Sequence, residues 1–181
     1  MSREIKEFIK EIISIIVIAF ILAMILRTFV IEGRIIPTGS MLPTIQLKDR
    51  VMVNKFIYRF KDVERGDIVV FDPPEALQTN QDYIKRVIGL PGEQVEMKNG
   101  KVYINDRPLK EPYLAEALDY EYGPVEVPEG CLLVLGDNRN HSFDSHYWNA
   151  WLTQDRLKGK AFLTYWPYNH IKLLQREVSY E

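Results

Sequence analysis

An uncharged apolar run near the amino terminus constrains this chain more than any other feature. Residues 12–26, IISIIVIAFILAMIL, contain no charged side chain and a single hydroxyl. A helix of this run alone is about 22 Å long, which is shorter than the ~30 Å hydrocarbon core of a bilayer. With the flanking apolar residues 8–9 and 29–31 the helix reaches about 36 Å. The sequence therefore predicts one transmembrane helix within residues 1–31.

The residues around this run bear on cleavage and orientation. A cleavable signal peptide would contain a similar run, but RTFVIEGRIIP follows it, without a small-residue Ala-x-Ala stretch. We therefore expect an uncleaved anchor, in which Arg27 near the far boundary can extend to the lipid headgroups. Arg3, Lys6 and Lys10 favour a cytoplasmic amino terminus and export of the remaining chain, although Arg27 and Arg34 weaken that orientation.

Composition excludes several classes of function. A chain of 181 residues with 46% hydrophobic side chains can fold, and a net charge of -2 offers no basic surface for nucleic acid. The single cysteine, Cys131, excludes an internal disulfide, and we expect it to be a small buried side chain. His141, His146 and His170 lack the short helical spacing of metal ligands, so we expect no metal site.

Residues 32–181 have the pattern of one β-rich domain. Short runs of β-branched and aromatic residues occur at 50–56, 67–72, 83–90, 131–137 and 159–166. Alternating runs also flank Asn99-Gly100, which predicts a hairpin because both residues tolerate the positive φ angles of a type I′ turn. Residues 106–130 are rich in Pro, Glu and Tyr and indicate a loop or small insertion. The predicted fold class is mostly β, with one amino-terminal helix.

The stretch PTGSMLPT, residues 37–44, places a serine on stiff, uncrowded backbone. Ser40 follows a glycine, and Pro37 and Pro43 restrict the chain on either side. Such a serine could present its hydroxyl and a backbone N–H to one carbonyl, as acyl transfer requires. Taken alone, the stretch is more often a plain turn with solvated hydroxyls. A nucleophile would need a base, and no histidine has an obvious partner for a Ser-His-Asp triad.

Lys85, within YIKRVIGLPGE, is the candidate base. Alternation along a strand places it on the face of Tyr83 and Val87, opposite Arg86. If that face is buried, loss of water disfavours the charged amine and lowers its pKa toward neutrality. An ordinary lysine on the surface of a strand is the alternative.

A third stretch, GDNRNHSFDSHYW at residues 136–148, is more polar than a turn requires. Its polar side chains include Asp137, Asn138, Arg139, Ser142, Asp144 and Ser145. A serine hydroxyl can orient a neutral lysine, and an aspartate can pair with an arginine to stiffen the loop. The simpler alternative is a hydrophilic loop closed by a tryptophan.

Taken in order, PTGSMLPT, KDRVMVNK, RGDIVVFDPP, YIKRVIGLPGE and GDNRNHSFDS resemble type I signal peptidases, the membrane-bound serine proteases that remove signal peptides from exported proteins. The resemblance extends from the apolar run to GKAFLTYWP and is closest to the compact, single-anchor members. It implies a signal-peptidase-like β-sheet domain outside the cytoplasm, a single anchor in the cell membrane, and no cofactor. The implied partners are signal peptides of exported preproteins and the lipid bilayer.

The resemblance also implies roles for individual residues. Ser40 would be the nucleophile and Lys85 the general base. The Thr38 hydroxyl and the backbone N–H of Ser40 would form the oxyanion hole, Ser142 would hold Lys85 in place, and Asp144 would belong to a structural ion pair. Cleavage would follow small residues in an Ala-x-Ala pattern. As the walls of the pockets for those residues we expect Ile36, Met41, Leu42 and Ile84.

Two positions depart from the family pattern. The family commonly has arginine at the position of His146 and glycine at that of Asn149, so the expected arginine partner of Asp144 is missing. We hypothesise that Arg86 or Arg139 replaces the lost cation, and that His146 pairs with Asp144 only when protonated.

Two alternatives come from other classes. A self-cleaving repressor would use a similar Ser-Lys pair on a related β-fold, but with a DNA-binding helical domain where this chain has its apolar run. A catalytically impaired relative could serve as a membrane-tethered, peptide-binding scaffold. The altered position His146 is compatible with such a scaffold, whereas the presence of both Ser40 and Lys85 argues against it.

Overall fold

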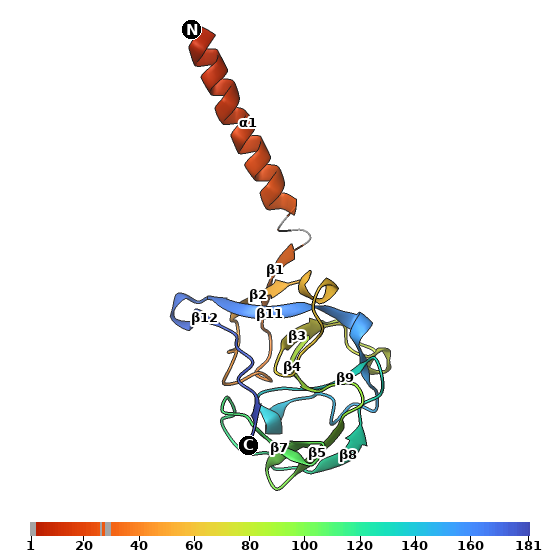
Figure 1. Cartoon of the computed structure of the whole chain (residues 1–181). Helices are drawn as coiled ribbons and strands as arrows, with labels where there is room; N and C mark the ends of the chain where they lie inside the picture. Colours follow the sequence, from red (N-terminus) through yellow and green to blue (C-terminus); the bar gives the residue numbers. More distant parts are fainter. Residues whose placement is uncertain (1–2, 26, 28–29) are drawn as a thin grey trace.

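The computed structural model describes residues 3–25, 27 and 30–181. One long helix, α1 (Arg3–Ile25), projects away from a β-rich part that contains the rest of the described chain (Figure 1). Within the described ranges, no helix is both long enough and apolar enough to cross a bilayer. Leu26 and Phe29, which belong to the predicted span, lie outside the described residues.

The larger of two sheets is antiparallel and has the strand order β1-β2-β11-β3-β4-β9-β10, with β12 paired to β11. Its strands are β1 (Ile31–Ile35), β2 (Arg50–Asn54), β3 (Ile68–Phe71), β4 (Tyr83–Gly89), β9 (Cys131–Leu135), β10 (Leu152–Thr153), β11 (Leu157–Trp166) and β12 (Lys172–Leu173). All five single-strand predictions fall on strands of this sheet.

The smaller sheet has the order β13-β7-β6-β5-β8. Its strands are β5 (Gln94–Lys98), β6 (Lys101–Ile104), β7 (Arg107–Lys110), β8 (Tyr122–Glu126) and β13 (Ser179–Tyr180). The β5–β6 hairpin turns at Asn99 (φ 52°) and Gly100 (φ 76°), which confirms the predicted turn. Residues 106–130, expected to be a loop or insertion, supply β7 and β8 to this sheet.

Short 3-10 turns occupy several connections. They are η2 (Ile57–Arg59), η3 (Glu75–Leu77), η4 (Arg139–His141), η5 (Gln154–Arg156) and η6 (Tyr168–His170). The turn η4 begins four positions after the last residue of β9 and lies in the polar stretch singled out from the sequence.

Three clusters of buried apolar side chains hold the β-rich part together. One includes Ile36, Met41, Ile45 and Ile84 and therefore packs beside both candidate catalytic positions. A second joins Ile88 of β4 to the small sheet. The third forms around Phe71 and other side chains of the large sheet. Complete burial of a large aliphatic or aromatic side chain contributes about 1.5–3 kcal/mol, so these clusters fix the strands that carry the site.

Strand β4 is buried on both faces from Ile84 to Gly89. Lys85 is therefore buried, and so is Arg86 on the opposite face, at 5% and 0% exposure. Cys131 is buried as expected.

Candidate active site

Ser40 lies in a tight turn between β1 and β2, at 8% exposure. The turn is closed by a hydrogen bond from Leu42 N to Gly39 O of 3.2 Å and one from Ile45 N to Met41 O of 2.8 Å. Met41 and Ile45 are buried in an apolar cluster and so attach the turn to the core. The backbone on either side of the serine is thereby fixed, as the prolines and glycine of this stretch predicted.

The structure brings the two predicted catalytic side chains together. Lys85 Nζ lies 2.6 Å from Ser40 Oγ, a buried contact between residues 45 positions apart in the chain. The Thr38 hydroxyl lies 3.4 Å from the same Ser40 Oγ. The side chains predicted to be the nucleophile, the base and one oxyanion donor are thus grouped at one point.

The electrostatic surroundings favour a neutral Lys85. Burial lowers the pKa of Lys85 from 10.5 to about 8, and the negative charges of Asp144 and Asp137 oppose this fall. The amine can therefore lose its proton close to physiological pH, which a lysine in water does not do.

Residues 136–138 hold the backbone at Ser40. Asn138 N donates to Ser40 O (3.0 Å), and Asn138 Nδ2 donates to Gly39 O (3.1 Å). Gly136 packs so closely that an added Cβ would overlap Ser40 O and Ser142 Oγ. No role for Asn138 or Gly136 was predicted from the sequence, where the many polar residues of this stretch were the only signal for them.

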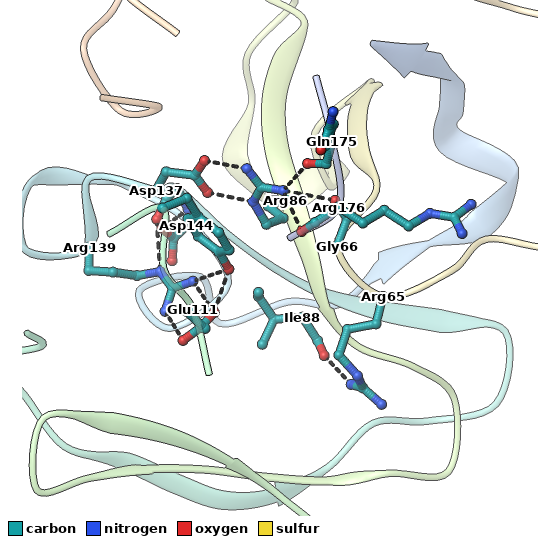
Figure 2. Close-up of polar contacts among 12 residues, drawn as sticks. Arg65, Gly66, Arg86, Ile88, Glu111, Asp137, Arg139, Asp144, Gln175 and Arg176 are labelled. Carbon is teal, nitrogen blue, oxygen red and sulfur yellow. Dashed lines mark hydrogen bonds and ion pairs between the residues drawn. The ribbon is translucent and has the colours of Figure 1, made fainter. Parts of the chain in front are cut away.

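Two buried arginine–carboxylate pairs fix this turn (Figure 2). Arg86 binds Asp137 through two hydrogen bonds of 2.8 and 2.7 Å. Arg139 binds both carboxylate oxygens of Glu111, at 3.0 and 2.7 Å, and donates to Gly136 O at 3.0 Å. Burial alone would lower the pKa of each guanidinium, but the partner carboxylate raises it above its ordinary value. Both arginines therefore remain charged.

The hypothesis that Arg86 or Arg139 replaces the missing cation beside Asp144 is wrong. Both guanidinium groups are already occupied by other carboxylates. Asp144 instead bonds His146 Nδ1 at 2.6 Å and accepts Gly136 N at 2.8 Å. A neutral histidine with its proton on Nδ1 can donate this bond, so the contact by itself does not require a protonated ring.

His146 is held by aromatic rings as well as by Asp144. Tyr120, from the segment between β7 and β8, stacks on its ring with centroids 4.1 Å apart and planes at 7°. His146 Nε2 is buried without a hydrogen-bond partner among the described residues, as is the Tyr120 hydroxyl. A buried ring nitrogen without a partner costs less free energy when it is a neutral acceptor than when it is a charged N–H. The second departure, Asn149, is exposed.

Ser142 differs from its expected arrangement. It is buried at 3% exposure, but its hydroxyl makes no hydrogen bond to the described protein groups, so the expected bond to Lys85 is not formed. The side chain packs against Gly136 instead.

An open pocket of about 500 Å³ exposes the pair to solvent. Its lining includes Thr38, Ser40, Ile84, Lys85 and Asn138. A neighbouring pocket of about 370 Å³ is lined by Ile36 and again by Ile84. Ile36 and Ile84, two of the four expected walls, thus line pockets beside Ser40, and their contact with substrate stays a prediction.

Met41 and Leu42 do not line either pocket. The prediction was wrong for Met41 because its side chain is turned into the core, at 0% exposure. Leu42 is partly buried beside Gly39.

A buried amine in contact with a serine hydroxyl, at the wall of an open pocket, is an arrangement expected of a serine hydrolase. The family model described as "Signal peptidase, peptidase S26" matches residues 9–166. The chain therefore belongs to the signal peptidase family, peptidase S26, and is a hydrolase.

Two curated relatives agree with this assignment. The chain is 48% identical over 159 residues to a probable signal peptidase I-2 of Synechocystis sp., covering 86% of this chain and 72% of that protein. It is 47% identical over 163 residues to a signal peptidase I of Leptolyngbya laminosa, covering 87% and 80%. A crystal structure of a signal peptidase I from Enterococcus faecalis is 36% identical, with a TM-score of 0.49, and covers 55% of this chain and 97% of that chain.

The structural role of the contact between Asp144 and His146 can be tested by measuring the free energy of unfolding of variants. His146→Phe keeps an aromatic ring against Tyr120 but leaves the buried Asp144 without one donor, so we expect the free energy of unfolding to fall by about 1–3 kcal/mol. Tyr120→Phe is the matched control, because it removes only a hydroxyl that has no partner among the described residues. Urea denaturation measures both. Equal stability of His146→Phe and the unsubstituted protein would contradict a structural role for the pair.

Proposed function

We propose that this signal peptidase cleaves the signal peptides of exported preproteins after small residues, with Ser40 as the nucleophile and Lys85 as the general base. The observation that carries this assignment of roles is the 2.6 Å contact between Lys85 Nζ and Ser40 Oγ. The lowered pKa of Lys85 supports it, because only a neutral amine can accept the serine proton. The catalytically impaired scaffold finds no support in the relatives, which are named as peptidases.

The reaction follows from this arrangement. Neutral Lys85 takes the hydroxyl proton of Ser40 while Oγ attacks the scissile carbonyl carbon. The Ser40 N–H and the Thr38 hydroxyl donate to the developing oxyanion. The Lys85 ammonium then protonates the leaving amine, and an ester to Ser40 remains. Lys85, neutral again, accepts a proton from a water molecule that attacks this ester. As the ester bond breaks and the signal peptide leaves, the Lys85 ammonium gives this proton to Ser40 Oγ, which restores both side chains.

The two adjacent pockets support cleavage after a small-x-small pattern. In an extended substrate, alternate side chains point to the same side. Two pockets that share Ile84 as a wall could hold two alternate side chains of one bound strand. Short side chains would let the scissile carbonyl come close to Ser40.

We also propose that residues 1–31 anchor the enzyme in a cell membrane, with the amino terminus in the cytoplasm and residues 32–181 as the extracytoplasmic catalytic domain. The uncharged run 12–26 and the exposed apolar side chains of α1, such as Ile15 and Phe20 at 65% each, support the anchor. Trp166, the last residue of β11, and Tyr168 of η6 are exposed at 52% and 79%, as interfacial aromatic residues would be.

Membrane anchoring can be tested by alkaline extraction. The full chain should stay in the membrane pellet at high pH, whereas the double variant Ile16→Lys and Phe20→Lys should be released, because each central lysine costs about 2.5–3.5 kcal/mol. The double variant Ile16→Leu and Phe20→Leu is the matched control. Release of the unsubstituted chain would refute the anchor, and protease that digests the β-rich part only from the cytoplasmic side would refute the orientation.

The catalytic assignment can be tested by substitution. Ser40→Ala and Lys85→Ala should each reduce cleavage of a synthetic precursor peptide carrying Ala-x-Ala by more than about 1,000-fold, because the two side chains act as a unit. The exposed Lys61 is the control, and Lys61→Ala should cleave normally. Substantial cleavage by either active-site variant would exclude that residue from the reaction. If the unsubstituted protein bound the peptide without cutting it, the scaffold alternative would be correct.

The lowered pKa of Lys85 predicts a pH dependence. The base must be neutral, so kcat/KM should rise as the pH increases through about 8 and level off above it. An exposed lysine would place the midpoint near 10.4. The measurement is a pH profile of peptide cleavage between pH 6 and 10. A midpoint near 10, or a rate that falls through this range, would contradict a buried neutral lysine.

A further inference from the structure

The last residues of the chain cross from one sheet to the other. Residues 174–181, here called the C-terminal strap, leave the large sheet after β12 and end in the small sheet as β13. They lie beyond the part matched by the family model, which ends at residue 166. Their contacts are therefore a property of this chain that the family match does not explain.

The strap begins in the core beneath the catalytic pair. Leu174, at 9% exposure, belongs to the apolar cluster of Met41, Ile45 and Ile84. Met41 and Ile84 are the chain neighbours of Ser40 and Lys85. The first residue of the strap thus packs on the supports of both catalytic side chains.

The next two residues cap a buried charge. Arg86 Nη1 donates to Gln175 O, Arg176 O and Gly66 O, each at 3.0 Å (Figure 2). The strap supplies two of these three carbonyls. A fully buried guanidinium needs such acceptors, because an unsatisfied buried donor on a charged group costs more than a neutral one.

Arg86 connects this cap to the nucleophile. Its other side holds Asp137 through two hydrogen bonds, and Asp137 precedes Asn138, which binds the backbone oxygens of Gly39 and Ser40. Arg86 is also the chain neighbour of Lys85 on β4. A shift of Arg86 would therefore reach both the serine and its base.

The far end of the strap is fixed to the small sheet. Ser179 and Tyr180 pair with β7, Glu181 N donates to Pro108 O at 3.1 Å, and Lys101 binds the Glu181 carboxylate. Val178 packs on the core of the small sheet. These contacts stabilise the strap without touching Arg86.

We propose that the carbonyls of Gln175 and Arg176 position the catalytic pair by holding Arg86, so that the C-terminal strap is part of the catalytic support of this enzyme. The inference rests on the proposed function, since its effect is on peptide cleavage. Because the strap contributes no residue to the lining of the two pockets beside Ser40, it acts on turnover and not on substrate binding.

A glycine pair provides the main test in the full-length chain. A Cβ on Gly66 would lie 2.8 Å from Arg176 O and 3.1 Å from Arg176 Cα, so Gly66→Ala must displace the strap. Gly130→Ala is the control, because Gly130 has a similar positive φ (73° against 86°) but no atom within 4 Å of its Cβ position. Both variants carry the same kind of backbone strain, and only one moves the strap.

The expected result is a separation of kcat from KM. For Gly66→Ala we expect kcat, per folded molecule, to fall by at least about tenfold with KM for the Ala-x-Ala peptide within about twofold, because small misplacements of reacting groups reduce turnover strongly. Gly130→Ala should keep kcat within about twofold. Equal kcat values for the two variants would overturn the inference.

Two truncations test the same point without a substitution. A chain ending at Glu177 loses β13 but keeps both carbonyls on Arg86, so its melting temperature should fall while kcat stays within about threefold. A chain ending at Leu174 loses the carbonyls, and its kcat should fall at least about tenfold. Parallel loss of kcat in both truncations would show a merely structural strap. If the chain ending at Leu174 does not fold, the glycine pair decides.

Failure of this inference is distinct from failure of the proposed function. If the unsubstituted protein cleaves the peptide and Ser40→Ala does not, the function stands, and only the comparison of Gly66→Ala with Gly130→Ala bears on the strap. If the unsubstituted protein does not cleave the peptide at all, both are overturned.

Discussion

The removal of water from one amine is the constraint on which the rest of the site depends. In the proposed reaction Lys85 can act as a base only while it stays buried. The surrounding groups must then stabilise the buried amine both when it is neutral and when it is protonated. Lys85 lies on a strand that is covered on both faces. Its amine contacts Ser40 Oγ, and Asp137 and Asp144 lie nearby. The carboxylates keep the pKa from falling further than about 8.

Each buried carboxylate near this site is hydrogen-bonded to a partner within the fold. Asp137 is held by Arg86, Glu111 by Arg139, and Asp144 by His146 and a backbone N–H. A free carboxylate next to Lys85 would form an ion pair with it and keep it protonated. Because Asp137 and Asp144 are hydrogen-bonded to other groups, the hydroxyl of Ser40 is the hydrogen-bonding partner of the Lys85 amine.

Much of this could be predicted from the sequence, and the limit has a physical reason. Strands, the Asn99-Gly100 hairpin and the pairing of Ser40 with Lys85 were predicted because local patterns and ordered motifs carry them. The partners of the buried charged side chains were not predicted. Arg139 binds Glu111 across 28 positions, and nothing in the spacing of either residue indicates this contact. Met41 failed as a pocket residue because the direction of a side chain in a turn depends on the packing beneath it.

The small sheet is best understood as a support for the chemistry that takes place in the large one. The segment between its strands β7 and β8 provides Glu111 for Arg139 and Tyr120 for His146, and β7 is the edge on which the C-terminal strap ends. Ile88 of β4 belongs to its apolar core, three residues beyond Lys85. A protein that binds a peptide needs only the pocket surface, whereas one that must hold an amine within hydrogen-bond distance of a hydroxyl needs the strand behind it to be rigid. The second sheet, the buried ion pairs and the strap all restrain that strand and the turn that faces it.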